Sequence, residues 1–225
     1  MVTNLAYFYE TSQKTRGGKW VWVKDSNGEE RKNVLLGGTI LNPKKGFDHL
    51  YAAQLVQYIP SVGMLIFRSF GVKTATAAAT DTTIYLNGDG YGDAPEVGML
   101  IMKAPSAANG TGQSALVTNV VYDEANEQFA VTLSVALGAL AAGDILVEAA
   151  GDEASAAATV LVPKPNTFVE ADRDLMPTEG YGLAGTANYS LSTVYDKQAW
   201  IQRMQPLPQY VLDMNRSYID GIFWI

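Results

Sequence analysis

Cysteine is absent from this sequence of 225 residues, and histidine occurs only once, at position 49. Without cysteine, no disulfide, thiolate nucleophile or cysteine-ligated metal can form. A single histidine excludes a histidine-rich metal site, and a Ser-His-Asp site would have to use His49, which we interpret as a structural or surface residue. The phosphate-binding pattern Gly-x-x-x-x-Gly-Lys-Ser/Thr and the nucleophile pattern Gly-x-Ser-x-Gly are also missing.

Long apolar runs are missing as well, which argues against a membrane protein. No run approaches the roughly 18 consecutive apolar residues that a membrane-spanning helix needs. The first four residues are not a basic stretch followed by an apolar one, so we see no secretory signal. We therefore expect no membrane partner.

Basic residues are almost missing from the middle third of the chain. Between Ala75 and Val162 there is one basic residue, Lys103, against eleven acidic ones. The first 74 residues carry ten basic and five acidic residues, and the last 63 carry five and seven. Charge blocks of this kind mark modules with different neighbours. We predict a basic N-terminal arm over residues 1–70, an acidic module over 71–165 and an aromatic-rich interaction segment over 166–225.

The overall charge indicates which partners to expect. A sequence pI of about 4.7 argues against nucleic acid as the main partner, because phosphate binding requires a basic surface. The basic arm is a local exception that suits an acidic protein surface or nucleic acid, unless it is simply a solvated face. Its basic residues are Lys14, Arg16, Lys19, Lys24, Arg31, Lys32, Lys44 and Lys45.

The acidic module has the pattern of short strands separated by turns. Val117, Val121, Val131 and Leu133 belong to a near-alternation of apolar and β-branched residues, as a half-buried sheet requires. Asp123–Glu127 is a polar hairpin tip. The expected strands are Thr82–Leu86, Met99–Lys103, Ala115–Tyr122, Gln128–Val135, Ile145–Ala149 and Thr159–Val162. This spacing predicts a mainly β fold with a small antiparallel β-barrel or sandwich.

Two short helices are expected in the flanks. One is predicted over Asp48–Gln57, where Asp48 is a plausible N-cap and apolar residues recur three or four positions apart. The other is predicted over Ser192–Gln205, with Pro206 and Pro208 ending it.

The rest of the flanks and the alanine-rich stretches are expected to be extended. Trp20–Val23 is strongly β-prone, Asn27-Gly28 is a hairpin signal, and Val34–Leu36 would be the returning strand. The alanine runs Ala75–Ala79 and Ala149–Ala158 alternate with Thr, Ser and Gly, so we interpret them as extended loops.

A five-residue string occurs twice. Val62–Ile66 and Val97–Ile101 are both Val-Gly-Met-Leu-Ile, and Ala142–Leu146 is a weaker echo. The unequal spacing excludes a solenoid period. We interpret the string as one turn-then-strand device that is reused where the chain enters a sheet, with chance similarity as the alternative.

Acidic residues near turns are the remaining candidates for chemistry. Asn87–Asp93 resembles part of a calcium loop but lacks the terminal glutamate of an EF-hand, and we interpret it as a glycine-rich hairpin tip. The carboxylate pairs Asp172 with Asp174 and Asp123 with Glu127 would suit a glycosidase, but solvated loop residues explain them more simply. We therefore expect no catalytic residue, no metal, no cofactor and no enzymatic activity.

Four stretches of the sequence together resemble a known class of proteins. Gly71–Thr74, Thr83–Leu86, Val97–Ile101 and Leu140–Leu146 resemble small β modules of tailed-bacteriophage head proteins, namely capsid decoration, auxiliary and head-fibre attachment proteins. The proline-punctuated flanks and the aromatic C-terminus resemble crAss-like phage head proteins. The resemblance implies a virion structural protein on the capsid exterior, assembled in the bacterial cytoplasm, which reinforces capsomer contacts or seats head fibres.

The resemblance also implies partners: the major capsid protein, head-fibre proteins and further copies of this chain. Aromatic and basic residues of the flanks are the types that anchor interfaces. The candidate interface residues are Trp20, Trp22, Arg31, Lys32, Trp200, Tyr210, Tyr218, Phe223 and Trp224. The alternative is a carbohydrate- or receptor-binding β module of a phage fibre or tail, for which tyrosine and tryptophan would supply stacking surfaces.

Overall fold

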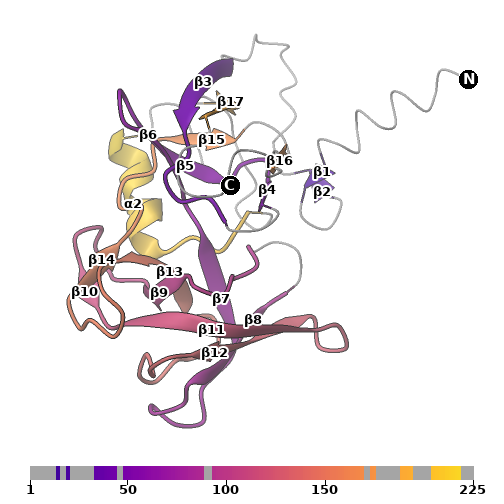
Figure 1. Cartoon of the computed structure of the whole chain (residues 1–225), viewed down its shortest axis with the longest axis vertical. Helices are drawn as coiled ribbons and strands as arrows, with labels where there is room; N and C mark the ends of the chain where they lie inside the picture. The colour runs from indigo at the N-terminus through magenta and orange to yellow at the C-terminus, as the bar shows by residue number, and fades with distance from the viewer. Residues whose placement is uncertain are drawn as a thin grey trace, which may run out of the picture. The chain divides into compact units, whose positions relative to one another are not determined.

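The structure is a computed structural model, and it divides the chain into two compact units (Figure 1). It describes residues 14–15, 19–20, 33–44, 48–88, 93–169, 173–175, 188–194 and 204–218. The first unit consists of Met1–Ile66, Pro165–Met204 and Met214–Ile225, and the second of Phe67–Lys164 and Gln205–Asp213. The second unit is therefore inserted into the chain of the first.

The second unit is a closed β-barrel. Its strands are β7 (Ser69–Thr74), β8 (Thr83–Asn87), β9 (Leu100–Lys103), β10 (Thr111–Gly112), β11 (Ser114–Asp123), β12 (Gln128–Leu133), β13 (Ile145–Ala150) and β14 (Ala158–Val160). Hydrogen-bonded neighbours run β7-β8-β12-β11-β9-β13 and return to β7, so six described strands close a ring. All these pairs are antiparallel, and β14 and β10 extend the sheet from β13. The prediction of a mainly β protein with a small antiparallel barrel or sandwich is confirmed, and the described strands form the barrel.

Apolar side chains fill the interior of the barrel, as is usual for barrels of this size. The buried core consists of Phe70, Val72, Ile84, Leu86, Met99, Ile101, Ala115, Val117, Val131, Leu133, Leu140 and Leu146. Alternation along β8 illustrates the cause, because Ile84 and Leu86 point inward whereas Tyr85 between them is 38% exposed. Each large apolar side chain buried in this way contributes about 1.5–3 kcal/mol.

The strands predicted for the acidic module are confirmed to within one residue at each end, except that β12 and β14 each end two residues early. Asp123 to Glu127 forms the predicted hairpin tip between β11 and β12. Residues 75–79 lie outside the strands, as expected for the first alanine run. The second run, Ala149–Ala158, is a loop only over residues 151–157, because Ala149 and Ala150 end β13 and Ala158 begins β14.

The repeated turn-then-strand device is present in two of its three copies. Met99 N–H donates to the Glu96 carbonyl, and Asp144 N–H donates to the Ala141 carbonyl, each at 3.1 Å. The third residue of these turns is Gly98 (φ 93°) in one copy and Gly143 (φ 88°) in the other. Both glycines have the left-handed conformation that a type II turn requires at this position. The first copy differs, because its β-turn closes earlier, from Val62 N–H to the Ile59 carbonyl.

The described strands of the first unit form a five-stranded sheet and two small ones. Its strands are β1 (Lys14–Thr15), β2 (Lys19–Trp20), β3 (Asn33–Thr39), β4 (Asp48–Leu50), β5 (Leu55–Ile59), β6 (Gly63–Ile66), β15 (Thr167–Val169), β16 (Arg173–Leu175) and β17 (Asn188–Val194). The large sheet has the order β3-β17-β15-β5-β6, while β1 pairs with β2 and β4 with β16. A bridge between Ile40 and Met64 joins the two edges of the large sheet. Its core contains Ile40, Leu50, Val56, Met64, Ile66 and Val169.

The predicted helix over Asp48–Gln57 is wrong. The segment forms β4, a turn, and the start of β5. Gln54 makes the turn, because its backbone N–H donates to the Tyr51 carbonyl and its side-chain oxygen accepts from Tyr51 N–H. β4 pairs with β16, more than 120 positions later, and such distant pairing overrides the local helical spacing.

The second predicted helix is also misplaced. Residues 192–194 belong to β17, and residues 195–203 lie outside the described part. The described helix is α2 (Gln209–Tyr218), which begins directly after Pro208. Pro208 supplies the carbonyl that accepts from Val211 N–H at 2.9 Å. Proline lacks an N–H and fits the start of a helix, so here it begins a helix instead of ending one.

The predicted hairpin between the Trp20 strand and Val34–Leu36 does not form in the described residues. β3, which contains Val34–Leu36, pairs along its whole length with β17, and Trp20 pairs with Lys14 of β1. The turn predicted at Asn27-Gly28 lies outside the described residues.

Candidate functional site

Three neighbouring strands of the barrel, β8, β12 and β11, present an exposed face with an apolar row. The strand register places Tyr85 opposite Ala130, and Ala130 opposite Val121. Tyr85 is 38% exposed and Val121 is 54% exposed. The next row toward the β11–β12 tip is polar, with Asn87 opposite Gln128 and Gln128 opposite Asp123. We call these two rows, with the tip residues Asp123–Glu127, the hairpin face.

A β-bulge explains why Val121 points outward. The register of β11 against β12 shifts between Val117 and Asn119, so Thr118 is an extra residue in β11. Val117 is fully buried, and simple alternation would bury Val121 with it. Val121 does not share that face, because the bulge reverses the alternation beyond Thr118.

Hydrogen bonds hold the tip of the hairpin face in one arrangement. The Asp123 carboxylate accepts from the side-chain amides of Asn126 at 2.7 Å and Gln128 at 3.1 Å. These bonds, led by that from Asn126, lower the pKa of Asp123, so its carboxylate stays charged. The Lys73 ammonium donates to the backbone carbonyls of Asn126 and Glu127. Lys73 therefore braces the backbone of the tip.

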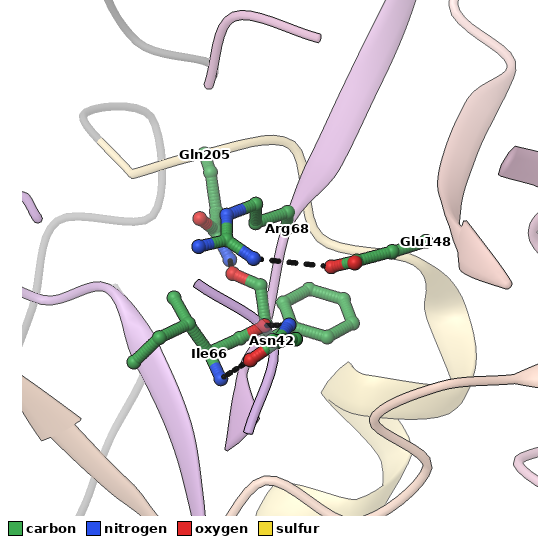
Figure 2. A network of polar contacts seen from close by, with 6 residues as sticks. Asn42, Ile66, Arg68, Glu148 and Gln205 are labelled. Carbon is green, nitrogen blue, oxygen red and sulfur yellow. Dashed lines mark hydrogen bonds and ion pairs between the residues drawn. The ribbon is translucent and has the colours of Figure 1, made fainter. Parts of the chain in front are cut away.

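The second unit contains a buried ion pair near the residue where its chain begins. Arg68 is 1% exposed, and its Nη1 lies 3.2 Å from Glu148 Oε2 on β13. Figure 2 shows the Arg68 side chain directed toward Glu148, with Gln205 beside it. Gln205 Nε2 donates to the Phe67 carbonyl at 3.3 Å, and the Ser69 hydroxyl donates to the Pro206 carbonyl at 2.6 Å. The C-terminal segment 205–213 is thus fastened to the start of the barrel.

Two asparagines of the first unit mark where the chain leaves it and returns to it. Asn42 donates to the Ile66 carbonyl and accepts from Ile66 N–H, both at 2.8 Å (Figure 2). Asn166 makes the same pair of bonds with the backbone of Tyr58, at 3.0 and 2.8 Å. Each side chain thereby replaces a neighbouring strand at a point where the sheet ladder is interrupted.

Few of the predicted interface residues lie in the described part. Trp20 ends β2 and Tyr218 ends α2, and only their backbone is described. Tyr210 is 2% exposed, and its hydroxyl has no hydrogen-bond partner among the described residues. Burial raises the pKa of Tyr210 far above its usual value. The remaining candidates, Trp22, Arg31, Lys32, Trp200, Phe223 and Trp224, lie outside the described residues.

The residues considered for chemistry are dispersed. His49 lies in β4 opposite Asp174 of β16, by backbone register. Asp123 and Glu127 lie on the hairpin face, whereas Asp172 is outside the described part. Asn87 ends β8, Asp93 is buried, and residues 89–92 between them are not described. No group of three or more possible metal ligands occurs in the described ranges.

Three further findings concern membrane-spanning helices, the hairpin face and the comparison with known proteins. Among the described elements, no helix is both long and apolar enough to cross a membrane. Sequence reasoning missed Tyr85 as a surface residue of the hairpin face, although its position between Ile84 and Leu86 signalled the alternation. No family model fits the sequence, and no curated protein is significantly similar to it.

Proposed function

We propose that this chain is a non-enzymatic virion structural protein of a tailed bacteriophage, which binds the outer capsid lattice and reinforces capsomer contacts or seats head fibres. One observation carries the proposal. An acidic barrel is inserted whole into the chain of a second β unit, entering at Phe67 and leaving at Lys164. Such an insertion allows the two units to have separate roles, because one unit can attach to the capsid while the other remains exposed to a further partner.

The composition of each part supports this division. Apolar side chains fill the barrel, so the groups available to a partner are on its outer surface. Its acidic excess keeps neighbouring particles apart in solution. The flanks, which belong mostly to the first unit, carry the basic and aromatic residues that interfaces favour. Partners on this reading are the major capsid protein and head-fibre proteins.

Co-sedimentation with phage heads tests the proposal. Heads that lack this protein, from a phage in which its coding sequence is deleted, are mixed with the purified full-length chain and sedimented through sucrose. We expect saturable binding, and loss of binding when residues 218–225 are removed. Protease resistance of the barrel serves as the control for folding of the shortened chain. A full-length chain that stays unbound at saturating concentration would refute the capsid role.

A carbohydrate-binding module of a phage fibre or tail is the second candidate, because of exposed aromatic rings near the hairpin face. Tyr122 is 50% exposed and lies 5.0 Å from the Phe129 ring, centroid to centroid. Such rings offer stacking surfaces for sugars. A glycan array distinguishes the candidates: specific binding that is lost in Tyr122→Ala would favour this function over a purely structural one.

A further inference from the structure

The hairpin face carries negative charge that its own unit leaves unbalanced. Among the described residues, the carboxylates of Glu124 and Glu127 form no ion pair, and Asp123 is held by amides without a cation. The Lys73 ammonium donates to backbone carbonyls of the tip. Lys103 is paired with Asp144, elsewhere on the barrel. The face therefore presents three carboxylates beside the apolar row of Tyr85, Ala130 and Val121.

A segment of the same chain has the complementary chemistry. Residues 14–32 contain six basic and three acidic residues, together with two tryptophans. Opposite charge attracts such a segment to the carboxylates of the tip, and an indole ring can cover the exposed side chains of Tyr85 and Val121.

We propose that the basic segment 14–32 of one copy binds the hairpin face of a second copy. The contact is heterologous, because two different surfaces meet, and it therefore links copies head to tail into rings or open chains. This self-association goes beyond capsid binding and takes place in the free protein in solution. The basic and the acidic blocks of the sequence then take part in the same contact.

Charge-reversal variants test the proposal by sedimentation velocity of the full-length chain. The wild-type protein should form oligomers that increase with concentration and dissociate at high salt, because screening shortens electrostatic reach to about 3 Å at 1 M. Glu124→Lys with Glu127→Lys, and separately Lys19→Glu with Lys24→Glu, should each weaken self-association about tenfold, as loss of a few exposed pairs predicts. Val121→Thr should weaken it without changing the charge.

Mixing the two charge-reversed proteins distinguishes a contact between copies from one within a copy. Each variant retains one intact surface, the segment in the first and the hairpin face in the second. A contact between copies therefore predicts that the mixture associates more strongly than either variant alone. A mixture that remains monomeric would place the contact within one chain and overturn the proposal, as would a wild-type protein that stays monomeric at low salt and high concentration.

A matched control on the same barrel changes equal charge at a distant site. Asp152 and Glu153 are exposed in the β13–β14 loop, and the Asp152 carbonyl accepts from the Ser114 hydroxyl at the start of β11. Figure 1 shows β10 and β14 at the opposite end of β11 from the hairpin tip. Asp152→Lys with Glu153→Lys should leave self-association unchanged. Equal weakening by this control would mean that net charge alone drives association, and would contradict a specific face.

Discussion

Two ion pairs of the barrel differ in how far water reaches them. Arg68 with Glu148 is nearly buried, at 1% and 13% exposure, whereas Lys103 with Asp144 is open, at 48% and 23%. Removing one partner of a buried pair leaves an uncompensated charge, which costs about 3–5 kcal/mol, while exposed pairs contribute about 0–1 kcal/mol. We therefore expect Glu148→Ala to destabilise the barrel strongly and Asp144→Ala to destabilise it little.

Urea unfolding, monitored by the protease protection of the barrel, measures the loss of stability in both variants. Glu148→Gln is the informative companion variant, because it removes the charge and keeps a hydrogen-bond acceptor for Arg68. The stability of Glu148→Gln should lie between that of wild type and that of Glu148→Ala. Equal and small losses for Glu148→Ala and Asp144→Ala would contradict the importance of burial at Arg68.

The stabilisation by the exposed pair of Lys103 and Asp144 should depend on pH. Burial raises the pKa of Asp144, but the hydrogen bonds from Lys103 and the Ala141 N–H and the charge of Lys103 together lower it below the ordinary value of 3.8. A lowered pKa in the folded state gives stabilisation that is present above about pH 4 and lost as pH falls through the folded pKa. Wild type should be more stable than Asp144→Asn at pH 7, and the difference in melting temperature should shrink by pH 2. A constant difference would exclude this linkage.

Tyr210 allows a test of a single hydroxyl group. The side chain is buried, and its oxygen has no hydrogen-bond partner among the described residues. An unsatisfied buried polar group costs about 1–3 kcal/mol. Tyr210→Phe removes only this oxygen, so we expect unchanged or higher stability in thermal unfolding, by up to about 1 kcal/mol. A clear loss of stability would reveal a partner for the hydroxyl.

At the level of elements, the β13–β14 loop contains a strained alanine. Ala154 is exposed and has φ of 59°, a left-handed conformation that costs a residue with a Cβ about 1–2 kcal/mol. Ala154→Gly should therefore raise the free energy of unfolding by about 0.5–1 kcal/mol. Ala156→Gly in the same loop, where φ is negative, should lower it by a similar amount. If both variants were destabilised alike, strain at Ala154 would be disproved.

The barrel strands could be predicted because local pattern and tertiary pairing agree there. Turn residues such as Gly98 and Gly143 fix where strands begin, and alternation fixes their faces. The bulge at Thr118 could not be predicted, since an extra residue leaves no trace in composition. Asp48–Gln57 was mispredicted because its helical spacing arises from a turn at Gln54 between two strands.

At the level of the whole molecule, the sequence indicated an acidic β module but not its insertion or its closure. The charge blocks follow the order of the chain, whereas the C-terminal segment 205–213 returns to the barrel and belongs to its unit. Hydrogen bonds from Gln205 and Ser69 accomplish this return, and neither has a sequence signal. Contacts between positions more than 130 apart are invisible to local patterns.

The candidate site was harder to predict than the fold. The interface residues were chosen by type, and type alone does not separate a buried tyrosine such as Tyr210 from an exposed one such as Tyr122. The hairpin face became recognisable only when the register of β8, β12 and β11 aligned Tyr85, Ala130 and Val121 in one row. Alignment across strands depends on turns and bulges, which single-sequence reasoning resolves poorly.

The most direct test of the capsid role is electron cryomicroscopy of intact virions, compared with particles of the phage that lacks this protein. Attachment to the outer capsid lattice predicts difference density at repeated positions on the head exterior, into which the closed barrel fits as one unit. Density confined to the tail or its fibres, or particles that are identical with and without the protein, would contradict it.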